Sequence, residues 1–140
     1  MTPTLMGRIQ TRWALLVIVG LPWTLVLMLF GLLTGAAYST LLAGGLLVLG
    51  LVGLLGTIWE GVYHGLQQFR WEKDWPALFG LVTIVNEGLV LWLVTVLLDR
   101  PLGALGWIHF VTTWLLMWIF ANGPMRVLAP RWRYRGGRLV

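Results

Sequence analysis

The stretch WALLVIVGLPWTLVLMLFGLL, residues 13–33, contains no charged side chain. A helix needs about 20 mostly apolar residues to cross the hydrocarbon core of a bilayer. Three further windows meet this requirement, at residues 41–66, 77–98 and 102–121. The sequence therefore predicts an all-α, polytopic membrane protein in which four transmembrane helices pack as a bundle.

The composition supports lipid as the surrounding medium. Apolar residues make up 59% of the chain and charged residues only 11%, against roughly 45–50% and 25% in soluble domains. A small soluble protein needs polar side chains to cover its large surface, and this chain has too few. We expect residues 1–140 to form a single integral membrane domain that ends in a basic tail at 122–140.

The basic residues indicate an orientation. With four spans, nine of the ten lysines and arginines fall on one side of the membrane, and only Arg100 falls on the other. Cytoplasmic segments of membrane proteins carry such an excess of positive charge. We expect both termini in the cytoplasm and the protein in the cell's inner membrane. The strong preference for arginine over lysine indicates a GC-rich, bacterial coding sequence.

Glu87 is the most informative residue, because it lies at the centre of the third window, about 15 Å from either end. A charge at this depth costs about 2.5–3.5 kcal/mol and must be compensated. Thr83 and Asn86 lie beside it, and we expect this polar face to point into the bundle. Two interpretations stay open: a proton- or cation-binding carboxylate, or a protonated acid that is hydrogen-bonded to another helix as a structural element.

The fourth window predicts a helix with two different faces. His109 shares one face with Thr112 and Thr113, and we expect this face to look inward. His109 is either a structural hydrogen-bonding residue or part of a relay to Glu87. The other face carries three tryptophans, which we expect to point outward, toward lipid or a partner protein: Trp107, Trp114 and Trp118.

A second polar group, Glu60, Tyr63 and His64, lies near the cytoplasmic end of the second window. The spacing of Glu60 and His64 would place two metal ligands on one helix face. No third ligand follows on this helix, so a solvated helix end is the preferred interpretation, and we predict no metal site. His64 and His109 lie in opposite halves of the membrane and cannot share a haem iron. No motif of a nucleophile, phosphate loop or zinc site is present, so we predict no cofactor and favour a protein that is not an enzyme.

Two further patterns indicate contact surfaces. Gly53, Thr57, Gly61 and Gly65 recur every four residues, and such small-residue stripes let another helix approach closely, within one chain or in a dimer. The tail alternates arginine with aromatic residues, which suits anionic lipid headgroups better than nucleic acid in a segment that directly follows a membrane helix. Its candidate contact residues are Arg131, Trp132, Arg133 and Arg135.

These observations favour a small accessory or assembly subunit of a larger membrane complex, which docks through its tryptophan-rich helix faces and its basic tail. The alternative is a small oligomeric transporter that couples transport to protons or cations through Glu87. The expected partners are a bilayer with anionic headgroups and either another membrane protein or further copies of the chain.

Overall fold

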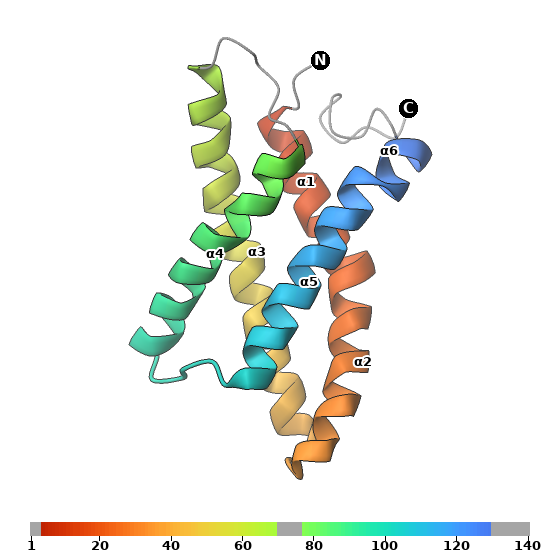
Figure 1. Ribbon diagram of the computed structural model, residues 1–140, viewed down its shortest axis with the longest axis vertical. Coiled ribbons are helices and arrows are strands. Elements are labelled where there is room, and N and C mark those ends of the chain that lie inside the picture. The colour runs from red at the N-terminus through yellow and green to blue at the C-terminus, as the bar shows by residue number, and fades with distance from the viewer. Residues whose placement is uncertain (1–3, 70–76, 130–140) are drawn as a thin grey trace.

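The structure is a computed structural model that describes residues 4–69 and 77–129, and all its regular elements in these ranges are helical (Figure 1). The predicted tail contacts Arg131, Trp132, Arg133 and Arg135 lie outside the described residues. The elements, in chain order, are α1 (Leu5–Leu15), the π-helix η1 (Leu16–Gly20), α2 (Leu21–Gly31), the 3-10 turn η2 (Leu32–Thr34), α3 (Tyr38–Gln68), α4 (Ala77–Leu97), α5 (Ala104–Asn122) and α6 (Pro124–Leu128).

Four helical runs are long and apolar enough to cross a membrane, which is the pattern of a multi-pass membrane protein. They are Leu5–Thr34, Tyr38–Gln68, Gly80–Leu97 and Ala104–Leu128. The predicted all-α architecture and the number of spans are therefore confirmed. The first turn of α1 and the short helix α6 lie at the same end of the bundle (Figure 1), as an even number of spans requires.

The first span begins earlier than the apolar pattern predicts. The helix begins at Leu5, where the Oγ1 of Thr4 accepts a hydrogen bond from the backbone N–H of Gly7 at 3.0 Å. No helix-breaking residue separates Arg12 from the apolar run, so α1 continues directly into it. Arg8 and Arg12 consequently belong to the first span.

Pro22 interrupts the regular α-helix of this span. Proline has no backbone N–H and cannot continue the regular hydrogen-bond ladder of the preceding turn. The helix widens into the π-helix η1 immediately before it, and α2 then begins at Leu21 with Pro22 in its first turn. The hydroxyl of Thr24 donates to the carbonyl of Gly20 at 2.7 Å, which supplies a local side-chain bond at this junction.

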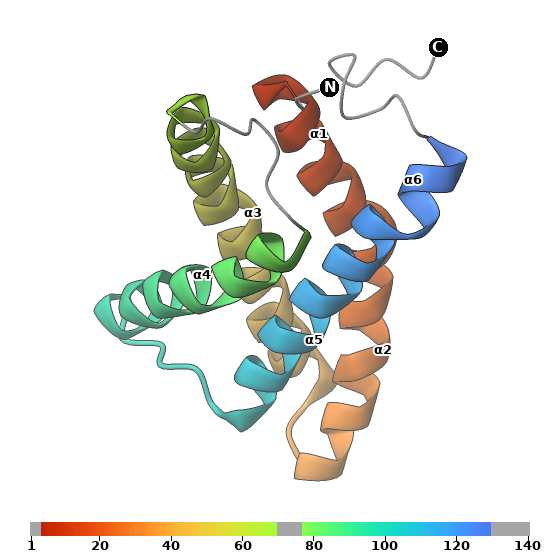
Figure 2. The same ribbon diagram turned by 45° about the horizontal axis from the view of Figure 1, so that its top comes forward.

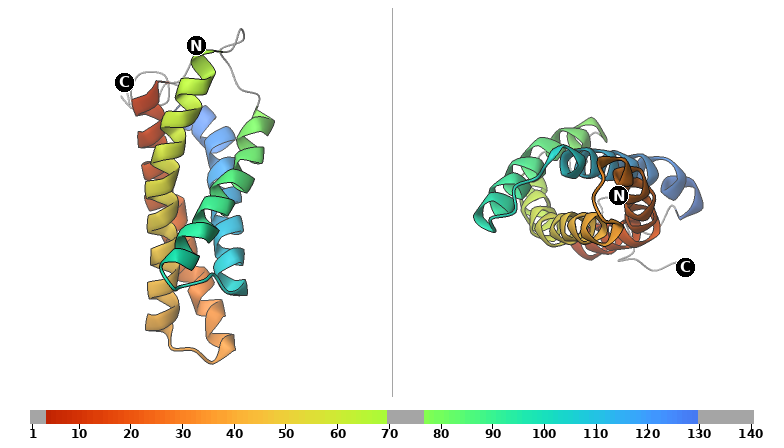
Figure 3. Two further views of the ribbon diagram at one scale, coloured as in Figure 1. Left: turned by 90° about the vertical axis from the view of Figure 1, so that its left-hand side faces the viewer. Right: turned by 90° about the horizontal axis from the view of Figure 1, so that it is seen from below.

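The helices pack around a core between the first span, α3 and α5. Helix α3 runs beside α1 and α2 over most of their length (Figure 3). Two glycines permit this approach: Gly45 lies against Thr24, and Gly53 lies against the ring of Trp13. Helix α4 packs against α3 and α5, and it inclines away from the other helices (Figure 2).

Candidate functional site: a buried arginine and carboxylate cluster

Arg12 of α1 lies at the centre of a cluster of charged residues from three helices. Its Nη1 lies 2.9 Å from Oε2 of Glu87, and its Nη2 lies 2.8 Å from Oε1 of the same carboxylate. This arrangement is bidentate, the strongest geometry for an arginine and a carboxylate. Only 4% of the Glu87 side chain and 9% of the Arg12 side chain are exposed, so the pair is shielded from the surroundings.

The same guanidinium binds a second carboxylate, Glu60 of α3. Its Nη2 and Nε donate to Oε1 of Glu60 at 3.1 and 3.3 Å. The other oxygen of Glu60 lies 3.7 Å from Nη1 of Arg8, and Arg8 also donates to the side chain of Gln67. The cluster thus combines two arginines with two glutamates, so its formal charges cancel inside the bundle.

The cluster lies within the spans, toward the end that carries α6 and the start of α1. Arg12 follows Leu5 by seven residues, which corresponds to about 10 Å along the helix. Glu60 precedes the last residue of α3, Gln68, by eight residues, or about 12 Å. Charges at such positions are costly in lipid unless they are paired and hydrogen-bonded. Mutual pairing is how this bundle compensates them.

Gly56 of α3 makes the cluster geometrically possible. A Cβ atom at this position would overlap the guanidinium group of Arg12. Because glycine has no Cβ, the long side chain of Arg12 can cross the surface of α3 and reach Glu87 on α4. Gly56 therefore allows the guanidinium of Arg12 to reach its place, although Gly56 itself has no polar side chain.

Trp114 of α5 completes the surroundings of Glu87. Its indole Nε1 donates to Oε2 of Glu87 at 3.3 Å, and the residue is only 7% exposed. The prediction that Trp114 points outward is therefore wrong. A buried indole N–H needs an acceptor, and the carboxylate of Glu87 provides one inside the bundle.

The other two tryptophans of this face also contact α4. Trp118 lies beside Gly80, and Trp107 lies near Gly88 and packs edge-on against Phe110. Both side chains are half-buried. The small residues of α4 create room for these large rings. The tryptophan face of α5 is consequently in large part an internal packing surface and not a free docking surface.

The predicted neighbours of Glu87 take other positions. The hydroxyl of Thr83 donates to the carbonyl of Gly80 at 2.8 Å, and Asn86 is exposed. The hydroxyl of Tyr63 on α3 lies near both side chains, but it is buried without a hydrogen-bond partner among the described residues. The ring of Tyr63 stacks on Trp59 with ring centroids 5.4 Å apart. The partners of Glu87 thus come from α1 and α5, and Thr83 and Asn86 are not among them.

The polar group Glu60, Tyr63 and His64 is divided by the structure. Glu60 belongs to the arginine cluster, Tyr63 faces α4, and the Nδ1 of His64 is buried without a partner among the described residues. Glu60 is therefore part of the bundle interior and not of a solvated helix end. Within residues 4–69 and 77–129, no three histidine, cysteine or acidic side chains lie together as metal ligands would.

His109 forms a separate polar centre on α5. It is fully buried, as predicted, and its Nε2 lies 2.8 Å from Oγ1 of Thr24. Because the Thr24 hydroxyl already donates to Gly20, it accepts from His109, and the proton of a neutral ring is placed on Nε2. The Nδ1 of His109 and the Oγ1 of Thr113 are buried without a partner in the described part of the chain.

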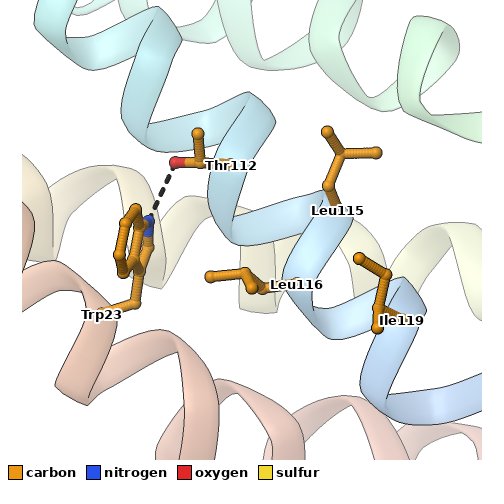
Figure 4. A pocket seen from close by; sticks show the side chains of 5 residues that line it. All are labelled: Trp23, Thr112, Leu115, Leu116 and Ile119. Carbon is orange, nitrogen blue, oxygen red and sulfur yellow. Dashed lines mark hydrogen bonds between the residues drawn. The ribbon is translucent and has the colours of Figure 1, made fainter. Parts of the chain in front are cut away.

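A pocket of about 260 Å³ lies between α2 and α5, lined by Trp23, Thr112, Leu115, Leu116 and Ile119 (Figure 4). The indole of Trp23 donates to the hydroxyl of Thr112 at 2.9 Å, and this hydroxyl donates to the carbonyl of Ile108. The polar atoms of these side chains are therefore occupied, and the lining presents apolar surface. It does not resemble a site for a polar or charged substrate.

The sequence interpretation missed the basic half of the cluster. From the sequence, Arg8 and Arg12 are only two of the nine basic residues on one side of the membrane, whereas the structure buries both side chains. One signal was available: a glutamate deep in an apolar helix needs a compensating charge, and Arg12 directly adjoins the first apolar run without a helix breaker between them.

Comparison of the chain with known protein families, curated proteins and solved structures finds no match.

Proposed function

We propose that this chain is a small accessory or assembly subunit of a larger membrane-protein complex. The observation that carries the proposal is the pairing of Glu87. Both carboxylate oxygens accept hydrogen bonds from Arg12, and one accepts a third from Trp114. A carboxylate held by three donors at a charge-balanced site is suited to fixing the arrangement of helices. We further propose a bacterial inner membrane, with both termini in the cytoplasm.

The outer surface of α3 leaves room for a partner helix to pack against it. Gly61 and Gly65 lie one helical turn apart, and no described side chain or backbone atom approaches the Cβ position of either within 4 Å. The neighbouring Ile58 and Leu66 are exposed. Two glycines at this spacing allow the backbone of another helix to come close. By contrast, Gly53 and Thr57 of the same stripe are used by Trp13 within this chain.

Mass spectrometry of the intact assembly, extracted from native membranes in a mild detergent, tests the proposal. We expect a mass well above the 15.8 kDa of the chain, with other polypeptides that co-purify in fixed ratio. A chain recovered alone, or only with copies of itself, would contradict an accessory role.

A matched pair of variants tests the docking surface. Gly61→Leu with Gly65→Leu should reduce the recovered partner, because the added side chains prevent close helix approach. Gly44→Leu with Gly50→Leu is the control, since these glycines lie on the same helix and are equally open. Equal recovery of the partner with both double variants would exclude the proposed surface. The basic tail, with Arg131, Trp132, Arg133 and Arg135, is proposed as an additional contact with anionic headgroups.

A second candidate is a small oligomeric transporter coupled to protons or cations through Glu87. The Nδ1 of His109 and the Oγ1 of Thr113, which are buried and have no partner in the described ranges, favour it, because buried polar atoms without a structural use are uncommon. The protein reconstituted in liposomes should then show pH-dependent flux that Glu87→Gln abolishes. Flux that is the same in this variant and in the wild type would exclude Glu87 as the coupling group.

A further inference from the structure

Helix α4 attaches to the bundle along one face. Its buried positions among the described residues are Glu87, Gly88, Leu91 and Thr95, and the half-buried Leu81 and Ile84 pack against the core. The opposite face is exposed and apolar, with the large exposed side chains Val82, Val85, Leu89, Trp92, Leu93, Val96 and Leu97. Glu87 is the only charged residue between Gly80 and Leu97, so it supplies every ionic contact of this segment.

The medium determines how much each anchor contributes. Lipid tails are as apolar as leucine, so a membrane helix that separates from its neighbours exchanges one apolar contact for another. The contacts of Leu91 are replaceable in this way. Those of the Glu87 carboxylate with Arg12 and Trp114 are not, because lipid offers no donors. The bonds of Glu87 are therefore the polar attachment of α4 that lipid cannot replace.

The cluster is asymmetric with respect to its two carboxylates. Arg12 also binds Glu60 through two nitrogens, and α1 is further joined to α3 by the bond from Trp13 to Thr57, at 3.1 Å. If Glu87 lost its charge, the guanidinium would keep Glu60 as its counter-ion. Helices α1 and α3 would stay together, and only α4 would lose its strongest attachment.

We propose that α4 is a movable helix whose docking is controlled by the charge of Glu87. When an Oε atom of Glu87 takes up one proton from water, an O–H bond forms, Arg12 keeps its own proton, and the cluster changes from neutral to a net charge of +1. Arg12 remains on Glu60 while α4 separates from α1 and α5. This device depends neither on a partner subunit nor on transport.

The groups that face Glu87 define what such a protonation must overcome. Helix α1 contributes Arg12, with Arg8 behind it, and α3 contributes Glu60 and the hydroxyl of Tyr63. Helix α5 contributes Trp114, which does not titrate.

Distances between spin labels test the proposal, because the chain contains no cysteine and accepts two introduced cysteines without background. Labels at the exposed positions Leu89 and Ile18 report the separation of α4 from the first span. Labels at Ile18 and Ile58, also exposed, report the reference distance from the first span to α3. The protein is measured in lipid nanodiscs at neutral and at acid pH.

We expect Glu87→Gln to lengthen and broaden the distance to α4 at neutral pH, with the reference distance unchanged, and acid pH to have the same effect on the wild type. Glu87→Asp keeps the charge and Glu60→Gln keeps the pair of Arg12 with Glu87, so both controls should retain the wild-type distance at neutral pH. The proposal is overturned if the label distance to α4 in Glu87→Gln is the same as in the wild type. It is also overturned if either control lengthens this distance as much as Glu87→Gln does.

Should Glu87→Gln fail to fold, the wild type decides the question, since it needs no substitution at this position. An unchanged distance to α4 at acid pH, in protein that remains folded by its reference distance, then overturns the proposal. The outcome is separable from that of the accessory role, because the labels report the geometry of the isolated chain and mass spectrometry reports the composition of its assembly.

Discussion

The guanidinium of Arg12 and the carboxylate of Glu87 face each other at 2.8 and 2.9 Å, although they lie 75 positions apart in the chain. Their helices, α1 and α4, have no extensive backbone contact of their own. The pair is thus a direct link between the first and third spans, and it crosses α3 at Gly56. Its two ends are unequal, because Arg12 has a second counter-ion and Glu87 has no second one among the described residues.

This inequality predicts that loss of Arg12 is more damaging than loss of Glu87. Arg12→Gln leaves Glu87 without a described cation and Glu60 with only Arg8, and removal of one partner of a buried ion pair typically costs about 3–5 kcal/mol. Glu87→Gln leaves Arg12 paired with Glu60 and should cost less. Reversible unfolding in mixed micelles, followed by tryptophan fluorescence, measures both. The control is Arg126→Gln, since Arg126 is exposed and bonds only Asn122 among described residues; equal losses at positions 12 and 87 would refute the inequality.

The double variant Arg12→Gln with Glu87→Gln should be more stable than the sum of the single losses predicts. It removes the cation and one anion together, so the cluster keeps Arg8 and Glu60, whose formal charges still cancel. Residues in direct contact commonly show coupling energies of about 0.5–3 kcal/mol. A complete double-mutant cycle in the same micelles measures this coupling, and strictly additive losses would show that the two side chains do not interact.

Gly56 should be intolerant of even the smallest side chain. Gly56→Ala places a methyl group where the guanidinium of Arg12 lies, so it should destabilise the fold and displace Arg12 from Glu87. Gly44→Ala is the matched control on the same helix, because no described atom outside its own stretch of helix backbone lies within 4 Å of its Cβ position. This control should be neutral or stabilising, by about 0.5–1 kcal/mol, as is usual for glycine to alanine within a helix. Equal behaviour of the two variants would contradict the proposed route of Arg12.

The sequence predicted the helices better than it predicted their inner faces. Apolar run length identifies a span directly, because the bilayer fixes the length that is required. The start of the first span was missed by this criterion, since Arg8 and Arg12 interrupt the apolar pattern while the helix itself continues. Charge marks where a chain usually leaves the membrane, but two arginines with two carboxylate partners can remain inside.

The assignment of faces on α5 shows a second limit. Helical periodicity correctly grouped His109 with Thr113 as buried residues. It also grouped Trp114 with Trp107 and Trp118, but it could not show that this second face meets α4. Periodicity separates helix faces that differ in polarity, but a helix that packs between two neighbouring helices buries both of its faces. The acceptor for the indole of Trp114 comes from another helix, and helical spacing within α5 carries no information about it.

Thr24 provides the last prediction, since its hydroxyl serves two groups at once. It donates to the carbonyl of Gly20 beside the π-helix and accepts from Nε2 of His109. Thr24→Val keeps the shape but removes both bonds, and it leaves the buried N–H of His109 without an acceptor, a loss of about 1–3 kcal/mol.

Thr34→Val is the control, because the hydroxyl of Thr34 bonds only the nearby carbonyl of Gly31 among described residues and the residue is exposed. Unfolding in micelles should show a clear loss for position 24 and little change for position 34. The imidazole resonances in a spectrum of ¹⁵N-histidine-labelled protein should also shift for His109 and not for His64. An unchanged His109 resonance in Thr24→Val would mean that the ring does not bond this hydroxyl. The assignment of the ring proton to Nε2 would then be wrong.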